Sequence, residues 1–272
     1  MKKSTVFIGG LLFSNLLIAG TNTAITCVPG QPQTSNGYES VKWYRDSAER
    51  NAIYREVFLL GENQIQQVVK AQHLKPHQWG VVFDIDETVL DDGAMYQQKV
   101  LQCQTMNFTL QDFSAFEVQG IAKATPGGAK ITCDIQKMGG YVSLISNRDG
   151  GYVDSKTGQN IMAATLKNLK QEGICFDQVI LMSKNSDSMD KNPRFTAVKT
   201  GVYPANMGYS NTLPKHPVIA YFGDNIQDFP NLAQQDMIKQ NPNGSAYDPF
   251  GVMYFSLPNP MYGSWQNNHD TQ

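Results

Sequence analysis

The order of apolar and polar residues along the chain predicts alternating helices and strands. From residue 38 to about residue 72, apolar side chains recur at three- and four-residue steps with Lys, Arg and Glu between them, which is helical spacing. The residues that carry this pattern are Val41, Tyr44, Ala48, Ile53, Val57 and Leu60. We predict two helices here, separated near Gly61.

Five short apolar runs follow, each with the length of a buried strand. They cover residues 81–83, 141–145, 178–182, 218–222 and 252–255. Between the second and third runs, Ile161, Leu166 and Leu169 recur at helical spacing over residues 161–172, and Gly173 stands where a helix C-cap belongs. Strands that alternate with helices indicate an α/β fold, a doubly wound parallel sheet with helices on both faces.

Polar residues follow four of these runs at the point where each strand ends. The segments are Asp84-Ile85-Asp86-Glu87-Thr88, then Ser146-Asn147-Arg148, then a stretch with Lys184, Lys191 and Arg194, and last Gly223-Asp224-Asn225 with Asp228. Parallel sheets bind ligands at the carboxyl ends of their strands. The sequence therefore predicts one site that gathers carboxylates, a hydroxyl and cations.

Asp84 and Asp86 are the most informative pair in this group. A strand places residues i and i+2 on the same side, so the two carboxylates repel each other unless a cation lies between them. This arrangement suits a Mg²⁺ site in which one carboxylate also attacks phosphorus. A solvated acidic loop and a helix N-cap cluster are the simpler alternatives. An EF-hand is excluded, because Val89 and Met95 occupy the positions of its Gly and its bidentate Glu.

Composition narrows the class of protein only slightly. The chain has 272 residues, of which 17% are charged and 41% hydrophobic, which is ordinary for one or two globular domains. The net charge of −2 and the lack of a basic run give no indication of a nucleic acid polymer as partner.

The N-terminus has the pattern of a secretory signal peptide. Two lysines precede the apolar residues 6–18, and small and polar residues continue to Ala24. We assign residues 1–24 to the signal, with cleavage after Ala24 or Gly20, and the Pro-, Thr-, Gln-, Ser- and Gly-rich residues 25–37 to a linker. The apolar stretch is too short to span a membrane, so no transmembrane segment is expected after cleavage.

The cysteines indicate whether the protein carries a lipid anchor and what kind of compartment it occupies. A lipoprotein would need Cys directly after a box such as Leu-Ile-Ala-Gly, where this chain has Thr21. We therefore expect an exported protein, periplasmic or secreted, without a lipid anchor. In an oxidising compartment the four cysteines allow two disulfides in three pairings, with buried free thiols as the alternative, and their spacing matches no zinc pattern. They are Cys27, Cys103, Cys133 and Cys175.

The four motifs together resemble those of the haloacid-dehalogenase (HAD) superfamily of phosphatases, DDDD type. More narrowly, the chain resembles the bacterial class C acid phosphatases from about residue 38 to residue 266. The markers are Asp86-Glu87-Thr88-Val89-Leu90-Asp91, Thr125-Pro126-Gly127-Gly128, Lys191-Asn192-Pro193-Arg194-Phe195 and residues 257–265. The resemblance implies a HAD-like domain over residues 38–272, with a small, mainly helical cap inserted at about residues 93–124. Residues 201–217 form a longer connection than is usual in this family.

The resemblance also implies the reaction. Asp84 would attack phosphorus and become an aspartyl-phosphate, and Asp86 would protonate the leaving oxygen and then activate water. An acidic pH optimum would follow. The cofactor would be Mg²⁺, held by the side chains of Asp84 and Asp224 and by the backbone carbonyl of Asp86. Asp228 would lie outside the ligand shell and orient a water or Lys191.

Phosphate binding is assigned in the same way. Ser146 and the backbone amide of Asn147 would hydrogen-bond the phosphoryl oxygens, and Lys191 would supply positive charge. Lys184 competes with Lys191 for this position, and the spacing of Lys191 to Arg194 favours Lys191. Arg148 would either clamp phosphate or pair with a neighbouring acid.

The leaving group is expected to meet aromatic residues. Tyr96 and Trp265 are the candidates for contact with a nucleobase or nicotinamide ring, whereas Phe113 and Phe116 are assigned to the core of the cap. The predicted activity is hydrolysis of small phosphomonoesters, among them nucleoside 5'-monophosphates. The alternatives are a binding or storage protein on the same fold, which the intact Asp84 argues against, and phosphotransfer to alcohols. The resemblance also suggests a homodimer.

Overall fold

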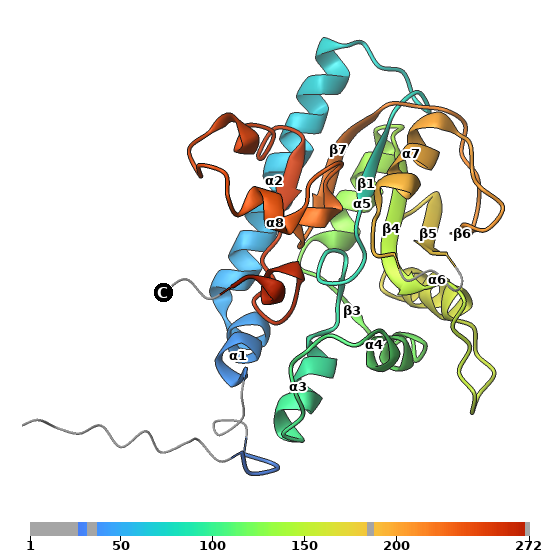
Figure 1. Ribbon diagram of the computed structural model, residues 1–272. Coiled ribbons are helices and arrows are strands. Elements are labelled where there is room, and N and C mark those ends of the chain that lie inside the picture. Colours follow the sequence, from blue (N-terminus) through green and yellow to red (C-terminus); the bar gives the residue numbers. More distant parts are fainter. Residues whose placement is uncertain (1–26, 32–36, 184–187, 270–272) are drawn as a thin grey trace, which may run out of the picture.

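The computed structural model describes residues 27–31, 37–183 and 188–269, and a mostly parallel six-stranded sheet forms its centre (Figure 1). The strand order is β6-β5-β4-β1-β7-β8. The strands are β1 (Gly80–Phe83), β4 (Tyr141–Asp149), β5 (Gln178–Met182), β6 (Gly208–Tyr209), β7 (Val218–Gly223) and β8 (Tyr254–Ser256). All five predicted runs form parallel strands, whereas β6 is antiparallel to β5. The predicted signal peptide and Lys184 lie outside the described residues.

Apolar residues cover both faces of the sheet, which confirms the doubly wound α/β fold. Val81 and Phe83 of β1 belong to a large core with helices α2 (Ala48–Ala71), α5 (Gly128–Lys137) and α6 (Ile161–Gln171). Val82 faces a smaller core that holds α7 (Asn192–Thr200). Because both faces are buried, the strands read as continuous apolar runs rather than as alternating ones.

The N-terminal helices differ from the prediction. They are α1 (Tyr38–Asp46) and α2, and the break between them falls at Ser47, whose side chain accepts a hydrogen bond from the backbone N–H of Arg50 and caps α2. The predicted break near Gly61 is wrong. Gly61 lies inside α2 because the helix packs closely on the sheet there, where a Cβ would meet Phe222 Cζ at 2.3 Å.

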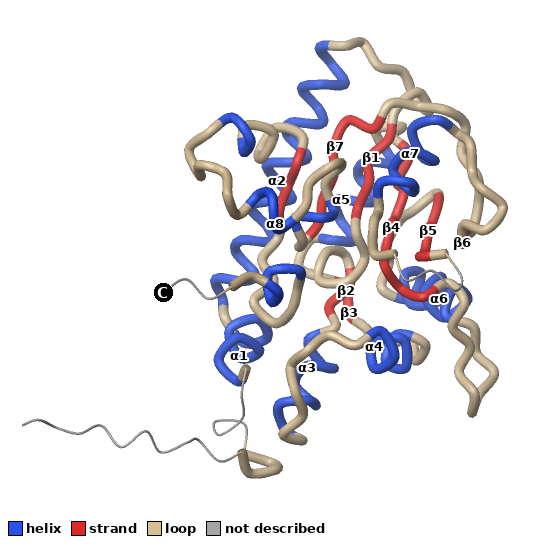
Figure 2. Tube along the Cα trace, viewed as in Figure 1, coloured by secondary structure: helices blue, strands red, loops and turns tan. Residues whose placement is uncertain are grey.

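The segment between β1 and α5 leaves the sheet and returns to it. A two-residue antiparallel pair, β2 (Leu90–Asp91) with β3 (Lys123–Ala124), closes this segment, and Figure 2 shows it below the main sheet. Between the two strands lie α3 (Gly93–Leu101) and α4 (Leu110–Glu117), so the region predicted as a cap is helical.

Two disulfides settle the pairing that the sequence left open. Cys27 bonds to Cys103 just after α3, and Cys133 of α5 bonds to Cys175 after α6. The first disulfide fastens the segment before α1 to the insert, where the backbone N–H of Gly30 also donates to the carbonyl of Leu101 at 2.9 Å.

The remaining elements are short. They are α8 (Gln234–Met237) and the 3-10 turns η2 (Ile226–Asp228), η3 (Ser245–Tyr247) and η4 (Ser264–Asn267). Among the described residues, none of the helices is both long enough and apolar enough to cross a bilayer. The long connection over residues 201–217 contains β6, which extends the sheet beyond β5.

Candidate active site

The carboxyl ends of the central strands open into a cavity of about 560 Å³. Asp84 follows β1 directly, and its backbone N–H donates to Phe222 of β7 at 2.8 Å, which fixes the start of the loop. Asp224 follows β7, and Lys191 stands at the N-cap of α7, whose start is favoured by Pro193. The cavity is lined by Asp84, Asp86, Asn147, Lys191, Asp224 and Asp228 among others. Five of the six residues predicted for catalysis, phosphate binding or metal binding thus share one cavity, together with Asp228, which was predicted to lie outside the ligand shell.

Lys191 joins two aspartates from different elements. Its Nζ donates to Asp84 Oδ1 and, at 2.6 Å, to Asp228 Oδ1. Lys191 and Asp84 are 4% and 8% exposed, so the pair is largely shielded from water and the interaction is strong. Burial raises the pKa of Asp84, and the charge of Lys191 opposes this shift. The other oxygen of Asp228 accepts the backbone N–H of Asn225 at 2.8 Å.

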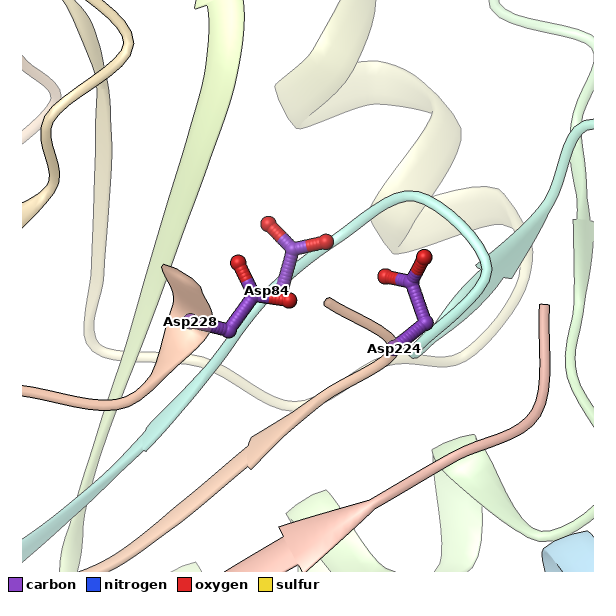
Figure 3. A group of neighbouring side chains, drawn as sticks. All are labelled: Asp84, Asp224 and Asp228. Carbon is purple, nitrogen blue, oxygen red and sulfur yellow. The ribbon is translucent and has the colours of Figure 1, made fainter. Parts of the chain in front are cut away.

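Asp84, Asp224 and Asp228 form the acidic cluster that Figure 3 shows, with carboxylate oxygens all within 4.8 Å of one another. Asn259 donates to Asp224 Oδ2 at 2.9 Å. Burial, with the nearby charge of Asp228, raises the pKa of Asp224 to about 7. Such a group of oxygen donors fits a hard divalent cation, which would also relieve the repulsion between the carboxylates.

Asp86 points to a different set of partners. Arg148 donates to its Oδ1 from Nε at 3.0 Å and from Nη2 at 2.6 Å, and Ser146 Oγ donates to its Oδ2 at 2.8 Å. Burial alone would raise the pKa of Asp86, but the charge and hydrogen bonds of Arg148 outweigh it and lower this pKa. Of the two roles left open for Arg148, the structure shows pairing with acids.

The other two phosphate-binding candidates also have partners within the protein. Ser146 is fully buried, and its hydroxyl is directed to Asp86 rather than to the cavity. The amide side chain of Asn147 donates to the carbonyl of Met189 at 3.0 Å and accepts a hydrogen bond from Arg194. Asn147 still lines the cavity, whereas phosphate binding by Ser146 stays a prediction that this arrangement does not favour.

The predicted aromatic contacts are placed differently from the expectation. Tyr96 is fully buried beneath Tyr262, with ring centroids 4.7 Å apart, and Trp265 is 42% exposed outside the cavity lining. The rings that do line the cavity belong to Phe108, Phe113 and Tyr262. Tyr262 of the C-terminal segment stacks on Tyr96 and Phe108 of the insert, so Tyr262 lines the cavity and Tyr96 lies beneath it.

Glu87 was not predicted as a site residue. It is fully buried, its backbone φ is 54°, and its carboxylate accepts the Asp92 backbone N–H at 2.9 Å and the hydroxyl of Tyr262. The hydroxyl of Tyr54 donates to the Glu87 carbonyl, so α2 helps to hold this left-handed conformation. The only sign of these contacts in the sequence was the position of Glu87 inside the acidic motif, since its partners Tyr54 and Tyr262 lie far from it along the chain.

The comparisons with known proteins identify the family and the fold. The sequence model of the HAD superfamily, subfamily IIIB (acid phosphatase), matches residues 31–265, and the chain belongs to this family. The fold resembles that of the class C acid phosphatase from Bacillus anthracis, at 23% identity and a TM-score of 0.67, over 87% of this chain and 89% of that one. A crystal structure of the same Bacillus anthracis enzyme with tungstate bound matches with a TM-score of 0.68, at the same identity and coverage.

Membership of this family makes the chain a phosphomonoesterase, as the sequence predicted. The class C resemblance of the sequence has its counterpart in the fold. The alternative of a binding or storage protein without enzymatic activity is therefore not supported.

Proposed function

We propose that this acid phosphatase is a Mg²⁺-dependent, exported enzyme that works through an aspartyl-phosphate on Asp84. The observation that carries the proposal is the placement of Asp84: its carboxylate lines the cavity, pairs with Lys191 and lies within 4.8 Å of the Asp224 carboxylate. A nucleophile, a cation and a second acidic ligand are thus available to one phosphoryl group.

Asp84, Asp224 and the backbone carbonyl of Asp86 are the groups we propose to hold Mg²⁺. When bound, the ion would draw charge from the phosphoryl oxygens and lower the repulsion that an anionic substrate meets. Asp228 remains outside the ligand shell in this proposal, because one of its oxygens pairs with Lys191 and the other accepts the Asn225 N–H.

In the first step, an oxygen of Asp84 forms a bond to phosphorus while the bond to the ester oxygen breaks, and Asp86 transfers a proton to that oxygen. In the second step, Asp86 takes a proton from water, whose oxygen attacks phosphorus and releases Asp84. Lys191 and the backbone amide of Asn147 bind the phosphoryl oxygens. Arg148 lowers the pKa of Asp86, which favours the deprotonated form that activates water in the second step, and the protonated form used in the first step is populated only at acidic pH.

The outer wall of the cavity supports a preference for esters with a planar leaving group. Phe108 and Tyr262 stack with a centroid separation of 5.8 Å, and both line the cavity beside Asn107 and Gln266. Stacking on such rings contributes about 1–3 kcal/mol per base. We propose nucleoside 5'-monophosphates as one substrate class, with Tyr262 and Phe108 in the contact role first assigned to Tyr96 and Trp265.

Export is supported by the two disulfides, which form and persist in oxidising compartments. The signal peptide predicted for residues 1–24 remains part of the proposal. A mature chain that begins near the linker is compatible with a periplasmic location and with a secreted one.

The decisive test replaces the proposed nucleophile. Asp84→Asn should leave the fold intact and reduce turnover of p-nitrophenyl phosphate by several orders of magnitude. Wild-type enzyme quenched in acid during turnover of a radiolabelled ester should carry label on Asp84, whereas the variant should carry none. Turnover above about a tenth of the wild-type value, or label on another residue, would remove Asp84 as nucleophile.

A further inference from the structure

We propose that Glu117 and Arg148 are positioning residues that fix the carboxyl group of Asp86, so that helix α4 of the insert contributes to proton transfer. The inference rests on the proposed role of Asp86 as acid and base. It concerns two side chains that lie behind Asp86, away from the cavity lining.

Arg148 is held at all three guanidinium nitrogens. Nε and Nη2 donate to Asp86, Nη2 also forms an ion pair with Glu117 Oε2, and Nη1 donates to Thr165 Oγ1 at 3.0 Å. The backbone N–H of Arg148 donates to Ser146 Oγ at 3.0 Å, and this hydroxyl donates to the second oxygen of Asp86. Both oxygens of Asp86 are therefore bound by groups whose own positions are fixed.

Glu117 completes this arrangement from a distant segment. It ends α4, and it is 1% exposed, while Arg148 is fully buried. One carboxylate oxygen of each of Asp86, Asp92 and Glu117 lies within 4.8 Å of the others, so a third acid lies beside the two that pair with Arg148. Removal of one partner of a buried ion pair leaves the other charge buried and uncompensated, which ties the position of α4 to that of Arg148.

The geometry matters because proton transfer requires a hydrogen-bonded approach to the leaving oxygen. A displacement of about 1 Å in a catalytic group lowers rates by as much as a hundredfold. Without Glu117, Nη2 of Arg148 would lose one of its two carboxylate partners, and the guanidinium could tilt around the remaining bonds to Asp86 and Thr165. Asp86 would then be held less accurately, although it would remain in place.

The experiment compares kcat/KM for two esters in the full-length enzyme. One is p-nitrophenyl phosphate, whose leaving group departs without a proton, and the other is an alkyl phosphate, whose alkoxide needs one. Glu117→Gln keeps the volume and removes the charge. We expect kcat/KM to fall at least about tenfold more for the alkyl ester than for p-nitrophenyl phosphate, since a general acid contributes about 10²–10⁴-fold.

Ser114→Ala is the matched control, because Ser114 is fully buried on the same helix and its hydroxyl has no hydrogen-bond partner among the residues that the structure describes. This variant should change kcat/KM for neither ester. Arg148→Lys cannot reproduce the forked contacts and should show the same selective loss as Glu117→Gln. It provides a second test if Glu117→Gln does not fold. Near-UV circular dichroism checks the fold of each.

Asp86→Asn distinguishes the proposed role of Asp86 as acid from the positioning role of Glu117 and Arg148. If it lacks the selective loss, the proposed role of Asp86 fails. The positioning role alone is overturned by a different result: Asp86→Asn shows that loss, while Glu117→Gln and Arg148→Lys lower kcat/KM equally for both esters, or for neither.

Discussion

Single residues in this protein acquire their roles from partners that lie far away in the sequence. Asp84 and Asp86 are two positions apart, yet Asp84 faces Lys191 while Asp86 faces Arg148 and Ser146. The pKa shifts follow from these partners: that of Asp84 is raised by burial, and that of Asp86 is lowered by the adjacent guanidinium. Two identical side chains at one strand end therefore have different electrostatic environments.

His216 allows a prediction about pH and stability. It is 2% exposed and its Nδ1 lies 2.7 Å from the Pro214 carbonyl. Burial lowers the pKa of His216 below the ordinary 6.5, against smaller opposing effects of the hydrogen bond to Pro214 and of the charge of Asp177. As the pH falls below about 6.5, the unfolded chain binds a proton at His216 before the folded chain does, so this residue makes the fold less stable in acid.

In His216→Gln, the free energy of unfolding should decrease less between about pH 7.5 and pH 5.5 than in the wild type. Urea unfolding at both pH values measures this, and His269→Gln, at an exposed histidine, is the control. An equal decrease in wild type and variant would show that His216 titrates alike in both states.

At the scale of elements, helix α2 shows how packing overrides a local signal. Gly61 interrupts an apolar helical pattern, and a break near it was the sequence-based prediction. The structure continues the helix through it, because only a residue without Cβ lets α2 approach Phe222 and Phe255 so closely. The same element supplies Tyr54, which supports the loop that carries Asp84 and Asp86.

Gly61→Ala should therefore destabilise the protein, although alanine favours helices by about 1 kcal/mol over glycine. Overpacking costs about 1–3 kcal/mol, and here a Cβ would lie 2.3 Å from Phe222 Cζ. Urea unfolding of the variant tests this, with Leu59→Ala, at a 58% exposed position of the same helix, as control. A variant more stable than the wild type would contradict the packing argument.

The Cys27–Cys103 disulfide fastens the segment before α1 to the insert across 76 residues. Changing both cysteines to serine should lower the free energy of unfolding by about 2–5 kcal/mol. The Cys133–Cys175 pair, replaced in the same way, gives the matched comparison. Thermal and urea unfolding measure both, and an unchanged midpoint for Cys27→Ser/Cys103→Ser would show that the insert needs no such anchor.

For the molecule as a whole, activity should depend on a divalent ion because Asp84 and Asp224, which follow β1 and β7, bring two carboxylates to one cavity, with Asp228 beside them. Thorough chelation with EDTA should abolish hydrolysis of p-nitrophenyl phosphate, and added Mg²⁺ should restore it. Mg²⁺ should also raise the thermal midpoint, since a ligand that binds only the folded state stabilises it. Full activity after chelation would refute the metal assignment.

The sequence by itself determined the class of fold and the motif residues, because continuous apolar strands and acidic strand ends are local patterns. It also placed helix α6, whose C-terminal Gly173 takes the expected left-handed φ of 72°. Tertiary structure alone decided the pairing of cysteines, the partners of Arg148, the burial of Tyr96 and the contacts of Glu87. These depend on contacts between segments remote along the chain, and no pattern of neighbouring residues encodes which remote side chain fills a given space.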